Sequence, residues 1–514
     1  MGYSTGQQNA VSSVANVSTA ADFYNAVMNP KVTRINVTKD LNFWEKFTDS
    51  SNIVHQMYNT NTIMTQYVPA GRDLTVNGQG HNVDFAGYSF YMGTPDKTLS
   101  IQDITMYGTN YYGPLSMLGS SSNYKTAVNY NNVTYIGNQL TYSPYAGITF
   151  SGVNNVQSGQ NYYPPVTDPS NKNTPNYVTM SQFATDYDSK NQYYRGSISS
   201  NVYARRVEFT KGSSYTGTTY NGSNFAIGGW GQYKPLDDNT PETQNSNSFI
   251  VGEDATVNLT PRGSSGSLYT PTGHGYGIYM MSAYGGIILN KNGQLNITPD
   301  INPNSYSQYS GLGVYSYGQN GIQVKDDAKF NVQITQPLQD WSNVVNLTNA
   351  YSTINTGQNS VFNISAINQP TTSKSTAYRN LLNTGTVLPR KYANYQKDFT
   401  PVTLGRDTSF NLSADGNAPV SLIQNGDPYT NTYSYGPGSN AYQNNQYIRD
   451  YYAPYIKADS LTKNNVTLDL SQNTANTGYY YSTIFSRNGS AGFYYPVNIE
   501  AKDTNITTDP SEKK

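Results

Sequence analysis

The chain has 514 residues, of which only 12% are charged, and 31 lysines and arginines against 32 aspartates and glutamates leave a formal net charge of −1 at pH 7. It therefore lacks the basic field through which proteins bind nucleic acid, and no specific nucleic-acid partner is expected. The sequence contains no cysteine, which excludes disulfide bonds, thiolate metal sites and a cysteine nucleophile. No apolar run approaches the about 18 residues of a membrane-spanning helix, so no membrane insertion is expected.

Tyrosine is the most unusual feature of the composition, at 49 residues, and asparagine, serine, threonine and glycine are also abundant. Such a surface is uncharged but rich in hydroxyls, amides and aromatic rings. Carbohydrates bind to flat aromatic faces and neutral hydrogen-bonding groups, so the composition favours a carbohydrate partner. The same residues can equally build the side-chain ladders and stacks of a long solenoid.

The N-terminal region is predicted to contain a flexible segment, residues 1–17, followed by a short helix over the sequence ADFYNAV. Ser18 or Thr19 can cap the first amides of this helix, and Pro30 closes the segment. Phe23 and Val27 lie one helical turn apart and form its apolar face. We expect the helix to cover the open N-terminal end of the fold, where an uncovered strand edge would pair with other chains.

The stretch from Arg72 to Gly113 predicts two successive coils of a parallel β-helix. Its apolar residues fall in short alternating clusters, which places them on one face of brief strands, and glycines supply the tight corners between the strands. Leu74 and Leu99 are separated by 25 positions, about one coil. The sequence therefore predicts an all-β fold, a parallel β-solenoid.

An internal repeat supports this fold over the C-terminal half of the chain. In each copy a polar turn leads to the pattern apolar-Asn-apolar, and the repeated asparagines are Asn258, Asn296, Asn331, Asn363 and Asn411. The irregular spacing is typical of a solenoid whose loops differ while its coils do not. Asparagines at equivalent points of successive coils are predicted to form an amide ladder inside or along the solenoid. Long lateral loops are predicted at 153–200, 212–247, 370–398 and 424–459.

No linker or change of composition divides the chain, so we expect one β-solenoid domain over residues 18–500. Residues 501–514 are expected to be a C-terminal tail. Met1 is not followed by the basic and apolar regions of a signal peptide. We therefore expect the sequence to be part of a longer protein.

Several segments of the N-terminal half carry a likeness to a known family: ADFYNAV, RINVTKDLNF, RDLTVNGQGHNVDF, LSIQDITMYGTNYYG and NNVTYIGNQLTYSP. Together they resemble the pectate-lyase-like adhesive domain, the ligand-binding region of serine-rich repeat adhesins of lactobacilli. The likeness is dense over about residues 15–220. It implies a right-handed parallel β-solenoid similar to pectate lyases but without lyase activity. It also implies a domain on the bacterial cell surface that binds pectin, glycosaminoglycans or other glycans of mucosal surfaces.

Two kinds of enzyme, a lyase and a hydrolase, are the alternatives to this expectation. A calcium-dependent lyase needs several clustered carboxylates, but Asp186, Asp188 and the pairs Asp237-Asp238 and Asp326-Asp327 form no cluster in the visible pattern, and the motifs of pectate lyases are missing. A polygalacturonase-like hydrolase needs separated acid and base carboxylates. His274, within Gly-His-Gly, follows Asp237-Asp238 in the order that polygalacturonases use, yet their other motifs are absent. The sequence therefore predicts neither an enzyme nor a metal site, and no cofactor.

Binding of an acidic polysaccharide requires aromatic faces for the sugar rings and cations for carboxylate or sulfate groups. The local combinations that meet this requirement lie beside the predicted loops. They comprise Arg205, Arg206, Lys211, Tyr215, Trp230, Tyr233, Lys234, Arg390 and Lys391. The alternative for each residue is a solvated strand face or a loop packed on the coil.

Charge adds a prediction about pH. Near pH 4 about half of the carboxylates are protonated, which brings the net charge to the order of +15. Affinity for an anionic polysaccharide is therefore expected to rise on acidification. A further alternative is a homotypic module, in which tyrosine-rich loops drive self-association of the bacteria.

Overall fold

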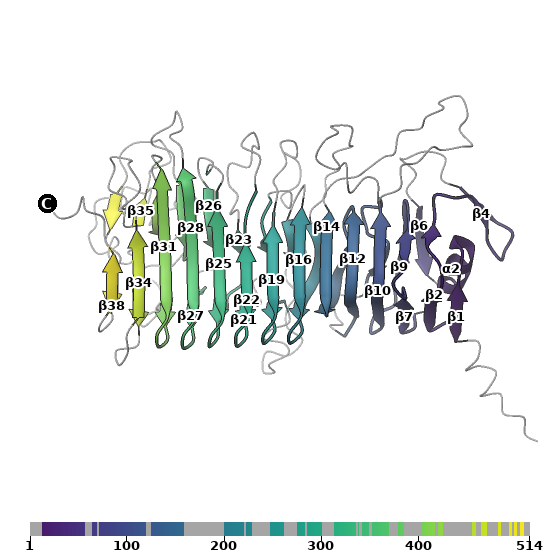
Figure 1. Cartoon of the computed structure of the whole chain (residues 1–514), viewed down its shortest axis with the longest axis horizontal. Helices are drawn as coiled ribbons and strands as arrows, with labels where there is room; N and C mark the ends of the chain where they lie inside the picture. The colour runs from purple at the N-terminus through teal and green to yellow at the C-terminus, as the bar shows by residue number, and fades with distance from the viewer. Residues whose placement is uncertain are drawn as a thin grey trace, which may run out of the picture.

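A computed structural model provides the fold. It describes residues 13–56, 64–68, 71–119, 125–158, 200–219, 223–228, 247–261, 275–282, 285–300, 313–335, 338, 342–348, 352–369, 379–384, 402–416, 420–424, 455–458, 464–469, 482–484, 493–495, 498–500 and 504–507. Short parallel strands follow one another around an elongated coil, with the helix α2 (Ala20–Val27) at its N-terminal end (Figure 1). Strands from successive coils pair in register and form three stacks along the molecule. The predicted parallel β-solenoid is confirmed.

The first stack begins with two strands that flank the helix in the sequence, and each later strand pairs with the equivalent strand of the next coil. Four longer strands bend and contribute to two stacks. The first stack comprises β1 (Val14–Val17), β2 (Arg34–Val37), β7 (Leu74–Asn77), the first halves of β10 (Thr98–Gly108) and β12 (Ala127–Gly137), the second halves of β13 (Thr141–Ser151) and β15 (Ser200–Phe209), β18 (Phe249–Val251), β21 (Ile287–Leu289), β24 (Ile322–Val324), β27 (Ile354–Thr356), β30 (Val402–Leu404), β33 (Tyr455–Ala458) and β37 (Asn498–Glu500).

The second stack forms the row of long arrows nearest the viewer in Figure 1. It comprises β3 (Leu41–Asn42), β8 (Asn82–Asp84), the second halves of β10 and β12, β14 (Val153–Ser158), β16 (Ser214–Thr219), β19 (Thr256–Thr260), β22 (Gln294–Ile297), β25 (Lys329–Ile334), β28 (Val361–Gln369), β31 (Ser409–Gly416), β34 (Asn464–Asp469) and β38 (Thr504–Thr507). The repeated asparagines occupy one register position of this stack. Asn296 Nδ2 donates to Asn258 Oδ1 at 2.9 Å, and Asn331 Nδ2 donates to Asn296 Oδ1 at 2.9 Å. The predicted amide ladder therefore runs along the outer surface.

The third stack completes each coil. It comprises β6 (Met64–Val68), β9 (Tyr88–Met92), β11 (Leu115–Met117), the first halves of β13 and β15, β17 (Ser223–Ile227), β20 (Ile278–Met280), β23 (Val314–Ser316), β26 (Ser342–Leu347), β29 (Arg379–Asn383) and β32 (Ser421–Gln424). The amide of Met117 donates to Ser143 Oγ at 3.0 Å, which joins β11 to β13. Two antiparallel pairs lie outside the stacks: β4 (Phe47–Thr48) with β5 (Val54–His55), and β35 (Ser482–Ile484) with β36 (Phe493–Tyr495).

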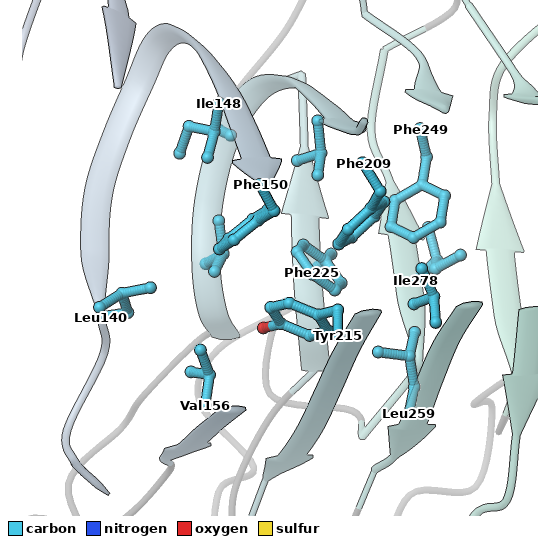
Figure 2. Packing of buried hydrophobic residues seen from close by; sticks show 14 of the residues in the cluster. Leu140, Ile148, Phe150, Val156, Phe209, Tyr215, Phe225, Phe249, Leu259 and Ile278 are labelled. Carbon is cyan, nitrogen blue, oxygen red and sulfur yellow. The ribbon is translucent and has the colours of Figure 1, made fainter. Parts of the chain in front are cut away.

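The core fills the inside of the coil with apolar side chains from all three stacks. Aromatic residues at one register position stack from coil to coil: the rings of Phe150 and Phe209 are 5.3 Å apart and nearly parallel. Figure 2 shows these rings together with Tyr215, Phe225 and Phe249 pointing into the interior. Burying such a column removes a large apolar area from water at every coil, which stabilises the stacking.

The N-terminal cap agrees with the prediction and is fixed by polar contacts at both ends of α2. Thr19 accepts a hydrogen bond from the amide of Asp22, and Phe23 is fully buried against the aromatic core. At the other end, the buried Arg72 guanidinium donates to the carbonyl oxygens of Val27 at 2.9 Å and Val32 at 2.6 Å. Burial lowers the pKa of Arg72 from its ordinary value. A cation that satisfies the last carbonyls of a helix also suits the negative end of its dipole.

Three expected boundaries differ from the structure. The solenoid begins within the predicted flexible segment, because β1 pairs with β2 from Val14 onward. It continues into the predicted tail, because β38 pairs with β34 as far as Thr507. The predicted loop 153–200 begins with strand β14, whose alternation is hidden in the sequence because Val153 is exposed whereas Asn154 is buried.

Candidate functional site

The outer face of the third stack carries a row of tyrosines at one register position. Tyr67 pairs with Tyr91, Tyr142 with Tyr203, and Tyr279 with Tyr315; Ser116 and Ala226 hold this position on the strands between them. The row follows from two-residue alternation, because the residues on either side of each tyrosine point toward the inside of the coil. We call Tyr67, Tyr91, Tyr142, Tyr203, Tyr279 and Tyr315 the tyrosine row.

The N-terminal part of the row meets two further tyrosines beside Ser116, and most of its rings cross at steep angles. Tyr112 lies edge-to-face against Tyr111 at 5.1 Å and 88°, and against Tyr142 at 5.4 Å and 74°. Tyr67 and Tyr91 cross at 78°. Tyr67 is 73% exposed and Tyr112 is 40% exposed. We call Tyr67, Tyr91, Tyr111, Tyr112 and Tyr142 the edge-on tyrosine patch.

The angles between the rings determine which ligand groups the patch can contact. Rings that stack in parallel cover a face of each partner, whereas in an edge-to-face pair only one face of one ring is covered. Tyr67 and Tyr112 therefore combine high exposure with an edge-to-face packing that holds each ring in place. Open aromatic faces beside hydroxyl groups suit a sugar, which presents an apolar ring face and polar substituents.

The C-terminal part of the row is built differently. The rings of Tyr279 and Tyr315 are stacked, 5.2 Å apart with an interplanar angle of 23°, and Tyr276 stacks on Tyr279 at 5.3 Å. We call Tyr276, Tyr279 and Tyr315 the stacked tyrosine group. Tyr276 is buried and also lies 5.5 Å from Tyr315 at 48°, so the three rings form a compact triangle that covers part of the ring faces of Tyr279 and Tyr315. Between the two parts, Tyr203 is only 2% exposed and Ala226 is buried, so the open surface is interrupted there.

Burial raises the pKa of four phenol groups of the row, those of Tyr91, Tyr142, Tyr203 and Tyr279. The pKa of Tyr91 and of Tyr142 is raised chiefly by burial and further by neighbouring tyrosines. Burial, with a smaller effect of Tyr315, raises the pKa of Tyr279 to about 12. These hydroxyls therefore remain protonated hydrogen-bond donors and acceptors across the physiological range.

Of the predicted cations in the described part, Arg205 lies nearest to the tyrosine row. It follows Tyr203 by two residues on β15, is 7% exposed, and its Nε donates to the carbonyl oxygen of Tyr145 at 3.4 Å. Arg206 pairs with Glu208 at 3.1 Å in the first stack. The exposed Lys211 lies 3.9 Å from Glu253 at the corner between the first and second stacks. The structure therefore does not gather the three cations into one site.

Tyr215 requires a correction, because its side chain is fully buried. Its ring packs against Phe150 at 4.8 Å and Phe225 at 5.2 Å inside the coil, as Figure 2 shows. Burial raises its pKa far above the ordinary value. Tyr215 therefore belongs to the core and cannot stack on a ligand. Trp230, Tyr233, Lys234, Arg390 and Lys391 lie outside the described residues.

Only some of the candidate catalytic residues lie in the described part of the chain. Asp186, Asp188, Asp237, Asp238 and His274 lie outside the described residues, whereas Asp326 and Asp327 occupy a corner. There Asp326 Oδ1 accepts the amide of Gln358 at 2.8 Å, and Asp327 Oδ1 accepts Asn359 Nδ2 at 2.8 Å. Both carboxylates thus accept hydrogen bonds from the next coil. Among the described residues, no three His, Cys, Asp or Glu side chains gather as metal ligands.

His55 belongs to the cap. Its Nε2 lies 2.8 Å from Asp49 Oδ2, and its ring packs against Tyr24 at 4.4 Å and Phe47 at 4.9 Å. His81 lies 3.4 Å from Asp40 near the surface. In the described part of the chain, no helix is long and apolar enough to cross a membrane.

A family model covers the part of the chain that contains the edge-on tyrosine patch. Residues 14–142 match the model of the pectate lyase-like adhesive domain. This is the family that the sequence resembles. All five tyrosines of the patch lie within the matched segment, whereas the stacked tyrosine group lies outside it.

Two solved structures, both serine-rich repeat proteins (SRRP) of Lactobacillus reuteri, are similar to this chain. The protein of strain 53608 is 14% identical, with a TM-score of 0.40, and the similarity covers 69% of this chain and 99% of that protein. The protein of strain 100-23 is 11% identical, with a TM-score of 0.34, and the similarity covers 80% of this chain and 96% of that protein. A search of curated proteins gives no match.

Proposed function

We propose that this chain is the binding domain of a non-catalytic surface adhesin, and that it holds polysaccharide on the edge-on tyrosine patch. The observation that carries the proposal is the open, edge-to-face packing of Tyr67 and Tyr112 within the segment that matches an adhesive family. Adhesion requires a rigid surface with fixed contact groups and no reacting residues. Three strand spacings of about 4.8 Å separate β6 from β13, so the patch offers about 14 Å for a few consecutive sugars.

The ligand class that we propose is acidic polysaccharide, such as pectin, glycosaminoglycan or another mucosal glycan. The near neutrality of the chain at pH 7 means that anionic ligands are neither strongly attracted nor repelled. Acidification protonates carboxylates while arginines and lysines keep their charge, which makes the surface positive. Affinity for an anionic polymer is therefore expected to be higher at about pH 4 than at neutral pH, at fixed ionic strength.

The match of residues 14–142 to an adhesive domain supports the further proposal that this chain acts on a bacterial cell surface. The domain then acts outside the cell, as part of a longer anchored protein. In that setting a chain without cysteine relies on its stacked core rather than on disulfide bonds.

The test is incubation of the purified chain with polygalacturonic acid at about pH 4 and at neutral pH, with and without calcium. Binding and the appearance of new chain ends are followed in the same samples. We expect binding that strengthens at low pH and no new ends. Unsaturated products would contradict the proposal in favour of a lyase, and new reducing ends in favour of a hydrolase. Self-association without glycan, with no glycan binding, would favour a homotypic module.

A further inference from the structure

The stacked tyrosine group occupies the same register position as the edge-on tyrosine patch but presents different chemistry. Tyr279 and Tyr315 are half-buried and stack on each other across neighbouring coils, and the buried Tyr276 packs against both rings. Both rings therefore present less open face than Tyr67 and Tyr112. Tyr317, two residues beyond Tyr315, is 48% exposed beside them. A surface of this kind can hydrogen-bond to hydroxyl or carboxylate groups, but it is less suited to stacking on a sugar ring.

The two tyrosine surfaces are separated but collinear. From Tyr142 on β13 to Tyr279 on β20 there are three strand spacings, about 14 Å at about 4.8 Å each. Across this gap Tyr203 and Ala226 are buried, so a short oligosaccharide on the first surface does not reach the second. From β6 to β23 the row extends over seven spacings, about 34 Å, which only an extended polymer can span.

We propose that the stacked tyrosine group is a second, hydrogen-bonding contact site for the same polysaccharide chain, which lies lengthwise along the third stack. This inference rests on the proposed function, because the occupant is the polymer held by the edge-on tyrosine patch. The uncharged phenols of the group suit the hydroxyls along such a chain. Once one part of the polymer is bound, the second contact forms within the complex and strengthens the whole.

A double variant distinguishes the contribution of the stacked tyrosine group from that of the edge-on tyrosine patch. In the double variant Tyr279→Phe and Tyr315→Phe both rings and their stacking remain, while both phenol hydroxyls are lost. Two hydrogen bonds, each contributing about 1 kcal/mol, predict a loss of affinity for polygalacturonic acid of about tenfold to thirtyfold. Affinity for trigalacturonic acid, which is too short to reach the second surface, is expected to stay unchanged.

The measurement is calorimetric titration of the wild-type chain and the double variant with both ligands, with thermal unfolding as the control for folding. Equal affinity of the two proteins for the polymer would overturn the inference. A parallel loss for the trimer would also overturn it, because the stacked group would then not be a separate contact. If the wild-type chain binds neither ligand, the proposed function itself fails, which is a distinct result.

Discussion

At the corners between the first and second stacks, single residues take a left-handed backbone conformation that few side chains tolerate. The equivalent positions hold Asp254, Asn292, Asp327 and Asn359, with φ between 55° and 59°. Asparagine and aspartate accept this conformation more readily than other non-glycine residues. They also link the coils, since Asn292 Nδ2 donates to Asp254 Oδ1 at 2.7 Å. The polar turns of the sequence repeat are therefore explained by backbone conformation and inter-coil hydrogen bonds.

The buried pair of Asp49 and His55 is the residue-scale feature of the cap that responds to pH. Asp49 Oδ1 accepts the amides of Ser51 at 2.8 Å and Ile53 at 3.0 Å, while its Oδ2 contacts His55. The hydrogen bond from His55, helped by these amides, holds the pKa of Asp49 below its ordinary value. Because the folded pKa is depressed, the pair stabilises the cap above the unfolded pKa and loses this contribution as pH falls through the folded pKa.

We predict that Asp49 stays ionised in the mildly acidic range in which binding is expected to strengthen. Carbon-13 NMR of the aspartate carboxyls, assigned with the variant Asp49→Asn, would give its titration midpoint. The expected midpoint lies below 3.8, the value of an unperturbed aspartate. A midpoint at or above that value would contradict the structure of the cap.

At the scale of elements, the aromatic columns inside the coil explain why successive strands stay in register. Phe330, Phe362 and Phe410 lie on β25, β28 and β31 and stack with centroid distances of 4.8 and 5.1 Å. On the outer side of the same strands, Asn331, Asn363 and Asn411 share one register position. A slip of one residue would exchange phenylalanine for asparagine in the core, so the sequence pattern excludes it.

We predict that Phe362→Ala destabilises these three coils by about 3–5 kcal/mol, because it removes a fully buried ring from the middle of the column. The matched change Asn363→Ala, on the outer side of the same strand, is expected to cost less than about 1 kcal/mol. Hydrogen exchange of the amides in β25, β28 and β31 measures both effects locally, which suits a solenoid that need not unfold in one step. Similar losses in the two variants would contradict this account of the core.

The elements also show how much the sequence can predict. Strong alternation with glycine corners at Leu74–Leu99, and the capping residues before Phe23, allowed the solenoid and its helix to be predicted. The outer strands β1 and β38 fall within the predicted flexible N-terminal segment and the predicted C-terminal tail, because four residues without a glycine corner carry too little pattern. Tyr215 was misplaced because a tyrosine beside cations suggests a surface, although its position opposite Val257 in the next coil puts it in the core.

The tyrosine row was missed for a related reason. Its members lie 24 to 76 residues apart in the chain, and only the pairing of strands brings them to one position. A local signal does exist, since Ile278-Tyr279-Met280 and Val314-Tyr315-Ser316 place a tyrosine between two inward residues. Which tyrosines pair from coil to coil depends on where each strand begins. The loops between the strands differ too much in length for the sequence pattern to predict this.

The whole molecule is a long, rigid surface whose three stacks carry different chemistry along their length. The second stack presents amides, the corners present paired aspartates and asparagines, and the third stack presents tyrosines. A solenoid adds such contacts coil by coil without altering its core. This architecture suits the proposed adhesin, which would hold a polymer along one side.

The most direct test of this account is the affinity of the wild-type chain and of two double variants for polygalacturonic acid at about pH 4. Tyr67→Ala with Tyr112→Ala removes the open ring faces, whereas Tyr67→Phe with Tyr112→Phe retains them. The account predicts at least a tenfold loss of affinity for the alanine pair and near wild-type affinity for the phenylalanine pair. Unchanged affinity in the alanine pair, with the fold intact, would show that polysaccharide binds elsewhere and would contradict the central claim.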